Sequence, residues 1–256
     1  MVKKRLIGVV TIRNGLAVQS FSYNSYLPLG NPLCIIQNLD RWGVDEILIQ
    51  VIDRSLKQLG PDFDLLNKLE RIQISTPLIY CGGIRNVHDA INVIKHGSDR
   101  IVLDFLLRNS NSELISISKA LGSQAVIASL PIVKDGNKLL LYNYESKIKQ
   151  ELENNFLELI SNKKIISEVL LINKETEGMP DSFDIDLISL FPDIDKPLIA
   201  FGGISEVKQI QDLFSKKQVS AVGIGNFLNY REHSVQLLKE SIKSDYLRSP
   251  IYSSKI

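Results

Sequence analysis

Short, almost continuously apolar runs recur along the whole chain. They are rich in Val, Ile and Leu, and polar residues do not alternate cleanly with apolar ones inside them. Near-continuous apolar strands are typical of a parallel sheet that is covered on both faces. We therefore predict eight strands, at Arg5–Thr11, Glu46–Val51, Pro77–Cys81, Arg100–Phe105, Gln124–Leu130, Glu168–Ile172, Pro197–Phe201 and Ser220–Ile224.

Helix-length segments lie between most of these strands, with apolar residues three and four positions apart. Two such stripes consist of Leu65, Leu66, Leu69 and Ile72, and of Val87, Ala90, Ile91 and Ile94, the second closed by Gly97. Residues 147–164 are rich in Lys and Glu and predict a solvated helix before the sixth strand. Strands alternating with helices predict an α/β fold, either a closed barrel or a doubly wound sheet.

Two connections predict extra hairpins. Arg13-Asn14-Gly15 follows the first strand, and Lys134-Asp135-Gly136-Asn137 follows the fifth, with a further apolar run after each. Asn-Gly and Asp-Gly between apolar runs are strong hairpin signals. The two hairpins lie four strand–helix units apart.

This spacing coincides with an internal repeat. At a shift of 120 residues, Gly82-Gly83-Ile84 falls on Gly202-Gly203-Ile204, and Leu6–Thr11 falls on Val126–Pro131. Repeats in one order indicate two halves of four units each. We predict a (β/α)8 TIM barrel with a twofold half-barrel repeat, and 256 residues match one such barrel, which gives a single domain over 1–256.

The amino-acid composition indicates which partners and which cellular compartment to expect. The net charge is +1, so no broad field favours nucleic acid or a membrane surface. No apolar stretch approaches the ~20 residues of a membrane helix, and the two cysteines, Cys34 and Cys81, are no disulfide framework, so we expect a cytoplasmic protein. Because no histidine has metal-ligand spacing, we expect neither a metal nor a cofactor.

The clearest candidate chemistry is the pair of Gly-Gly turns, Gly82-Gly83 and Gly202-Gly203. Each follows a strand and precedes a helix, where backbone N–H groups and a helix N-terminus favour an anion. The next units end in Asp104-Phe105 and Gly225-Asn226. This pattern predicts two phosphate sites on opposite sides of one barrel mouth, for a phosphorylated small molecule. The alternative is that the glycines only make tight turns.

Five segments together resemble the cyclase subunit of imidazole glycerol phosphate synthase. They are the hairpin turn at Asn14-Gly15, Gly82–Arg85, Gly122–Val126, Gly202-Gly203 and Tyr230–Glu232. The resemblance runs almost end to end and implies a barrel that binds a bisphosphate-like substrate. It also implies a partner, a separate glutaminase subunit, whose ammonia travels through the barrel from its N-terminal face.

The chain departs from this family where the chemistry occurs. The resemblance implies two catalytic aspartates, at the ends of the first and fifth strands, and these positions hold Thr11 and Pro131. Threonine does not titrate near neutral pH, and proline has no functional side chain. The two positions coincide under the repeat, and the loop after the sixth strand, Ile172–Met179, also departs from the family pattern. We therefore assign no catalytic residue.

The opposite end of the barrel keeps the family's charges. The resemblance implies an ammonia gate at the starts of four strands, made of Arg5, Glu46, Arg100 and Glu168. It also places Asp45 and Asp99 near the face that docks the glutaminase. The alternative is a layer of charges that only neutralise one another.

Three functions follow as hypotheses. The first is an ammonia-passing barrel without cyclase chemistry, similar to a divergent branch in bacterial surface-sugar pathways, where a third protein, an amidotransferase, makes an acetamidino group. The second is a working histidine-pathway cyclase with relocated acids, Asp53 and Glu175, which follow the second and sixth strands. Helix caps and loop hydrogen bonds explain these two carboxylates equally well. The third is a non-catalytic scaffold or activator of the glutaminase.

Overall fold

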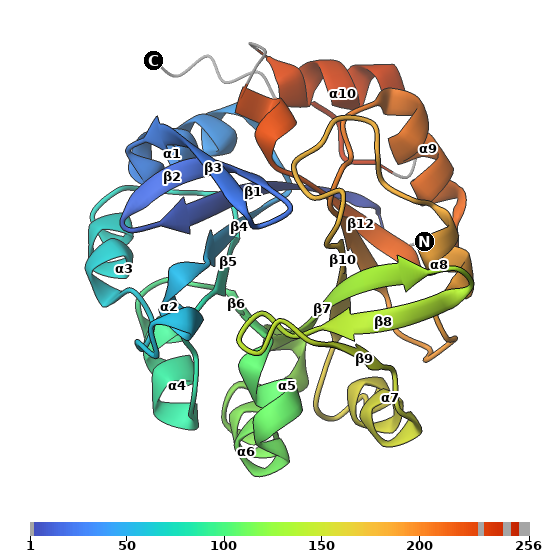
Figure 1. The fold of residues 1–256 in the computed structure, drawn as a ribbon. Coiled ribbons are helices and arrows are strands. Elements are labelled where there is room, and N and C mark those ends of the chain that lie inside the picture. Colours follow the sequence, from blue (N-terminus) through green and yellow to red (C-terminus); the bar gives the residue numbers. More distant parts are fainter. Residues whose placement is uncertain (1–2, 230–232, 243–246, 251–256) are drawn as a thin grey trace.

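Eight parallel strands close into a barrel in the computed structural model, which describes residues 3–229, 233–242 and 247–250. Their order around the ring is β1, β4, β5, β6, β7, β10, β11 and β12, and β12 pairs with β1 to close it (Figure 1). The bounds are β1 Arg5–Arg13, β4 Glu46–Val51, β5 Leu78–Cys81, β6 Arg100–Leu103, β7 Val126–Asp135, β10 Glu168–Asn173, β11 Leu198–Phe201 and β12 Val219–Ile224. The predicted strands and the closed barrel are confirmed. The family segment Tyr230–Glu232 lies outside the described residues.

Ten α-helices of the described residues surround this ring (Figure 1). They are α1 Pro32–Trp42, α2 Asp53–Leu56, α3 Phe63–Glu70, α4 Val87–Lys95, α5 Phe105–Asn109, α6 Asn111–Leu121, α7 Asn154–Ser161, α8 Asp186–Leu190, α9 Val207–Ser215 and α10 Ser234–Ile242. Side-chain caps fix several starts, for example Asn86, whose oxygen accepts the Asp89 N–H at α4. None of the described helices is both long and apolar enough to span a membrane.

Two helix predictions need correction. In α4 the stripe is confirmed for Ala90, which is buried, and for Val87 and Ile94, which pack against the core. The other buried residue is Val93 and not Ile91, because the helix turns a slightly different face to the barrel. Residues 147–164 are not one helix: β9 (Lys149–Glu151) precedes α7 and pairs with β8 (Lys138–Tyr142). The sheet ladder with β8 outweighs the helical preference of this Lys- and Glu-rich segment.

Both predicted hairpins are present. β1 turns into β2 (Leu16–Phe21) through Asn14 and Gly15, which both have positive φ, as this tight turn requires. β7 turns into β8 through Gly136, which has φ +57°. Each hairpin gains a third strand, β3 (Ser25–Gly30) or β9, and Figure 1 shows the two hairpins on opposite sides of the barrel.

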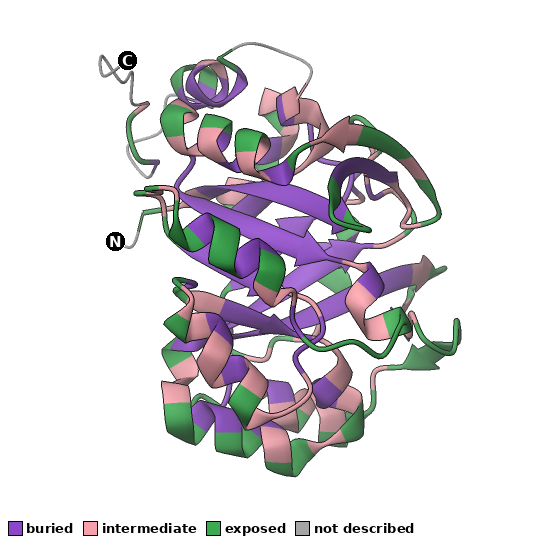
Figure 2. Ribbon diagram, turned by 90° about the vertical axis from the view of Figure 1, so that its left-hand side faces the viewer, coloured by how far each residue is buried: buried purple, intermediate pink, exposed green. Residues whose placement is uncertain are grey.

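Apolar side chains fill both the barrel and the layer between barrel and helices. Figure 2 shows that most residues of the barrel strands are buried. The interior set is Ile7, Val9, Leu48, Ile79, Val102, Ile127, Leu170, Ile172, Ile199, Phe201 and Ala221. Inward residues of this fold form layers rather than a pore. The interior therefore separates a polar layer at the strand starts from a polar mouth at the strand ends.

Candidate functional site

Four charged side chains meet at the N-terminal end of the barrel. Arg5 pairs with Glu46 at 3.2 Å and also with Glu168. Arg100 completes the cycle, since its Nη1 lies 3.5 Å from Glu46 Oε1 and 2.6 Å from Glu168 Oε2. The side chains are only 10–16% exposed. The structure thus brings together all four residues of the predicted gate, as a closed ring.

The two carboxylates of this ring are held differently. Arg100 and Arg5 together outweigh the burial of Glu168 and keep the pKa of that carboxyl below its ordinary value. Burial dominates at Glu46 and raises its pKa, because its arginine contacts are longer and Glu168 repels it. Glu46 Oε2 and Glu168 Oε2 are both buried without a hydrogen bond among the described residues, but only Glu168 Oε2 has an arginine nitrogen as close as 2.6 Å. The ring therefore has one strongly paired side and one weaker side.

The two predicted docking carboxylates lie in different environments. Asp99 is exposed, and its Oδ2 accepts the Leu78 N–H at 2.8 Å. Asp45 is 4% exposed and is held by the Leu6 N–H at 2.7 Å and by Lys239 Nζ at 2.9 Å. Asp99 is within reach of a partner, whereas Asp45 organises the barrel end from inside.

Two cavities open at the mouth, where the strands end. The first holds about 440 Å³ and lies over the first half-barrel, beside Gly82-Gly83, Asp53 and Asp104. The second holds about 330 Å³ and lies over the second half-barrel, beside Gly203, Gly225 and Asn226. We call them the first and second cavities. Each predicted Gly-Gly turn thus borders its own cavity.

The positions of the two missing acids add no titratable group. Thr11 lies at the end of β1, is 7% exposed and lines the second cavity. Pro131 is buried in β7 beside Ile172 of β10. Neither residue can give or take a proton at neutral pH.

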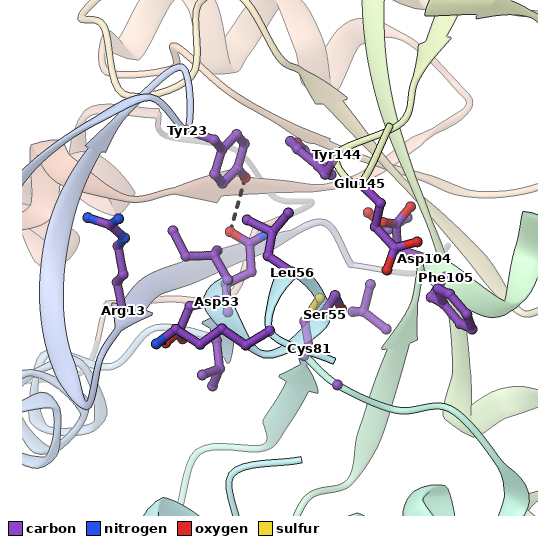
Figure 3. Close-up of a pocket in the computed structure, with 18 of the residues that line it drawn as sticks. Arg13, Tyr23, Asp53, Ser55, Leu56, Cys81, Asp104, Phe105, Tyr144 and Glu145 are labelled. Carbon is purple, nitrogen blue, oxygen red and sulfur yellow. Dashed lines mark hydrogen bonds and ion pairs between the residues drawn. The ribbon is translucent and has the colours of Figure 1, made fainter. Parts of the chain in front are cut away.

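Tyrosines from the two hairpins meet over the mouth. Tyr23, just after β2, and Tyr144, just after β8, pack edge to face with ring centroids 5.3 Å apart. Tyr23 also donates a hydrogen bond to Gln50 at 3.0 Å, and Figure 3 shows the two rings reaching in from opposite sides. Tyr142 packs against Tyr144 at 5.3 Å. This aromatic bridge joins the two half-barrels above the first cavity.

Glu177, in the loop after β10, ties that loop to the first hairpin. Its carboxylate accepts hydrogen bonds from Ser20 Oγ at 2.8 Å and from the Tyr23 N–H at 3.1 Å. It is 2% exposed and lines the second cavity, and burial raises its pKa to about 6. A carboxyl with such a pKa in a cleft is a candidate functional group.

The glycine turns have a packing cause that mirrors the repeat. A Cβ on Gly82 would lie 2.5 Å from the Val51 carbonyl oxygen, and one on Gly202 would lie 2.4 Å from that of Asn173. Val51 and Asn173 each end the preceding strand. Close backbone approach thus explains glycine at both positions, so phosphate binding there stays a prediction.

Several hydrogen-bond donors near these turns are already used. At α4, Asp89 accepts the Arg85 N–H, and Glu113 accepts the Val87 N–H. At α9, Gln209 accepts the Ser205 N–H. The Asn226 amide donates to the Ser20 and Gly178 carbonyls. These particular donors are therefore not free to bind a ligand.

The proposed relocated acids do not share a cavity. Asp53 lines the first cavity, where it accepts from Lys57 at 2.7 Å and from the Asn14 N–H at 3.2 Å. Glu175 is exposed, pairs with Lys149 at 3.3 Å and lines neither cavity. Cys81 lines the first cavity, and burial raises the pKa of its thiol to about 12. Within the described residues, no three His, Cys, Asp or Glu side chains are grouped to hold a metal ion.

Sequence reasoning missed the aromatic bridge, Glu177 and Arg108 as members of the mouth. One signal existed for the bridge, since Tyr23 falls on Tyr144 at a shift of 121 residues, close to that of the repeat. Another existed for Arg108, which follows Asp104 by four residues and pairs with it at 2.7 Å. No local pattern marked Glu177, because its burial depends on the distant hairpin.

Comparison with known proteins gives a consistent result along the chain. The family described as histidine biosynthesis protein matches residues 5–234. The whole chain is 28% identical to the putative imidazole glycerol phosphate synthase subunit hisF2 of Vibrio vulnificus and covers 94% of that protein. Over 94% of its length, it is 25% identical to the imidazole glycerol phosphate synthase subunit HisF of Alkaliphilus metalliredigens, of which it covers 96%. It is 24% identical to the HisF subunit of Exiguobacterium sp., with both chains fully covered.

Proposed function

The chain belongs to the histidine biosynthesis protein family and is HisF-like, and from this premise we propose that it is the barrel subunit of a glutamine amidotransferase complex. It receives ammonia from a glutaminase subunit and passes it toward amidation of a surface-polysaccharide sugar, with a third protein, an amidotransferase, as a further partner. It belongs to a divergent branch that does not close an imidazole ring. The relatives are named as subunits, which supports a partner.

The observation that carries this proposal is the closed ring of Arg5, Glu46, Arg100 and Glu168 beneath a mouth without the two acids. The ring is nearly buried, and a buried ion-pair network is often no more stabilising than apolar residues of similar volume, so stability alone is a weak reason for four such charges. The ring closes the path to the apolar interior, so docking of the glutaminase must rotate at least one of its side chains. Neutral ammonia crosses an apolar layer far more easily than a buried ammonium ion does.

The mouth supports transfer better than ring closure. Thr11 and Pro131 supply no general acid or base. Glu177 has a pKa of about 6 in the second cavity and is mostly ionised at neutral pH. It can hold a cationic nitrogen or take one proton there.

Glutamine hydrolysis by the glutaminase partner, measured with and without this chain, tests the proposal. We expect a stable complex and a faster hydrolysis. Asp99→Lys, on the docking face, weakens the complex, and Glu168→Gln changes the stimulation while the complex persists. Lys138→Gln, on the exposed hairpin at the opposite end, leaves both unchanged. No complex, or equal effects of all three variants, would overturn the proposal.

A further inference from the structure

The two mouth cavities carry opposite charge. Five cationic side chains and three carboxylates line the first cavity; the cations are Arg13, Lys57, Arg108, Lys147 and Lys174, and the carboxylates are Asp53, Asp104 and Glu145. Among the described residues that line the second cavity, Glu177 alone is charged. A ligand that spans the mouth therefore meets a positive end and a negative end.

The positive charge of the first cavity is only partly neutralised. Lys57 pairs with Asp53, and Arg108 pairs with Asp104. Lys174 instead lies over the Tyr142 ring at 4.8 Å, and Arg13 lies over Tyr26 at 4.4 Å. In the part of the chain that is described, no carboxylate is within ion-pair distance of Arg13, Lys147 or Lys174.

Buried polar atoms in the same cavity point to a ligand with acceptor oxygens. The Arg108 side chain is 10% exposed, and its Nε makes no hydrogen bond to any described residue. The Tyr144 hydroxyl is likewise buried without a hydrogen-bond partner. A buried donor is costly when it lacks a partner, so an occupant that accepts from both groups would be stabilised here.

Aromatic side chains form the walls of the first cavity. Tyr23 and Tyr144 cover it from the two hairpins, and Phe105 lies beside it (Figure 3). The Arg85 guanidinium lies 4.7 Å from the Phe105 ring centroid. Flat apolar faces combined with hydroxyl groups suit a ring-shaped, amphipathic ligand. A cavity of about 440 Å³ accommodates one sugar with an anionic substituent.

The second cavity does not suit a second anion. The buried Glu177 carboxylate faces it, and like charges repel strongly when they are shielded from water. Gln209 accepts the Ser205 N–H, and the Asn226 amide is occupied by two carbonyls. A second phosphate would be repelled there by the Glu177 carboxylate.

We infer that the mouth binds a sugar with a single anionic group, a phosphate or a carboxylate, in the first cavity, and places an uncharged or cationic part of that sugar against Glu177. The ligand class thus differs from a substrate with a phosphate at each end. This inference names the acceptor of the proposed function and rests on it for that biological meaning.

Calorimetric titration of the purified full chain tests the ligand class with four probes: inorganic phosphate, glucose 6-phosphate, glucuronate and fructose 1,6-bisphosphate. We expect one site per chain for glucose 6-phosphate or glucuronate, and whichever binds tighter identifies the anionic group. Fructose 1,6-bisphosphate binds no tighter than glucose 6-phosphate. A bisphosphate that binds more than about tenfold tighter, two sites for inorganic phosphate, or no binding by any probe would overturn the inference.

Variants with a matched control separate the two ends of the mouth. Lys174→Gln weakens binding of the anionic sugar about tenfold, because it removes a charge that contacts the ligand. Lys138→Gln removes an exposed charge outside the cavity and changes nothing. Glu177→Gln strengthens binding of fructose 1,6-bisphosphate relative to that of glucose 6-phosphate, because it removes the carboxylate that repels a second anion. Equal effects of the two lysine variants, or unchanged bisphosphate binding in Glu177→Gln, would contradict the assignment.

Failure here is distinguishable from failure of the proposed function. The titration needs no glutaminase, and the hydrolysis assay needs no sugar. If the chain stimulates the glutaminase but binds no probe, the proposed function is supported and the inferred ligand class is wrong. If it binds the sugar but no glutaminase, the reverse holds.

Discussion

Replacing Glu168 by glutamine tests how firmly the charged ring closes the barrel. Glu168 bridges both arginines: Oε2 lies 2.6 Å from Arg100 Nη1, and Oε1 accepts from Arg5 and, at 2.9 Å, from the Ser220 hydroxyl. Glutamine preserves the shape and one acceptor oxygen but removes the charge. Two nearly buried guanidinium groups then share Glu46 alone.

The magnitude follows from burial. An exposed ion pair is worth ~0–1 kcal/mol, whereas removal of one partner from a buried pair costs ~3–5 kcal/mol. The Glu168 side chain is 10% exposed, and Glu46 still partly neutralises the arginines. We therefore expect the free energy of unfolding to fall by about 2–4 kcal/mol. Glu70→Gln, on the exposed face of α3, is the matched control and changes it by less than about 0.5 kcal/mol.

Urea unfolding across pH adds a second check. The pKa of Glu168 is lower in the folded chain than its ordinary value of 4.5, so its stabilisation is present above pH 4.5 and is lost as the pH falls through the lower folded value. The gap between the native chain and Glu168→Gln should narrow under acid conditions. The closed ring would be refuted if Glu168→Gln lowered the free energy of unfolding by less than about 1 kcal/mol at pH 7, or if the difference between variant and native chain did not change with pH.

Three further predictions concern the mouth. Gly178 has φ +81°, and a Cβ there would lie 1.7 Å from the Ser20 carbonyl oxygen, so Gly178→Ala lowers the free energy of unfolding by about 2–5 kcal/mol. The control Gly97→Ala, at φ +90° with open space around the Cβ, lowers it by about 1–2 kcal/mol. Equal losses in urea unfolding would contradict this packing. Burial raises the pKa of Glu177 from 4.5 to about 6, so the native chain loses stability as the pH rises between these values. Between pH 4 and pH 7, the free energy of unfolding of Glu177→Gln should therefore rise by about 2 kcal/mol relative to that of the native chain. The same difference between the two proteins at both pH values would be evidence against the burial effect. Tyr23→Phe loses the hydrogen bond to Gln50 and lowers the free energy of unfolding by about 1 kcal/mol in the same assay. Tyr144→Phe removes a hydroxyl that has no hydrogen-bond partner among the described residues and does not lower it; the reverse order would mean that the bridge is assigned wrongly.

The barrel could be predicted from the sequence because its determinants are local and repeated. The apolar runs mark the eight strands, and Asn14-Gly15 and Gly136 mark the two hairpin turns. The strand starts carry Arg5, Glu46, Arg100 and Glu168 at equivalent heights, so a closed barrel brings them together. Spacing along the chain was sufficient for the strands and the hairpins, whereas the charged ring was expected from the family resemblance.

The mouth could not be predicted in the same way, because it is assembled by contacts between distant loops. Glu177 is buried by a hairpin that lies more than 150 positions earlier in the chain. Tyr23 and Tyr144 stand in turns, where no periodicity shows the direction of a side chain. β9 also depends on its ladder with β8 rather than on its own composition.

We propose a barrel that receives ammonia from a glutaminase and does not close an imidazole ring. The most direct test combines this chain, its glutaminase partner, glutamine and the bisphosphate precursor of imidazole glycerol phosphate, and follows glutamate and imidazole products together. We predict that the chain accelerates glutamate formation and that no imidazole product forms. Imidazole formation would establish a working cyclase. Glutamate formation at the rate of the glutaminase alone would contradict the proposal that this chain receives its ammonia.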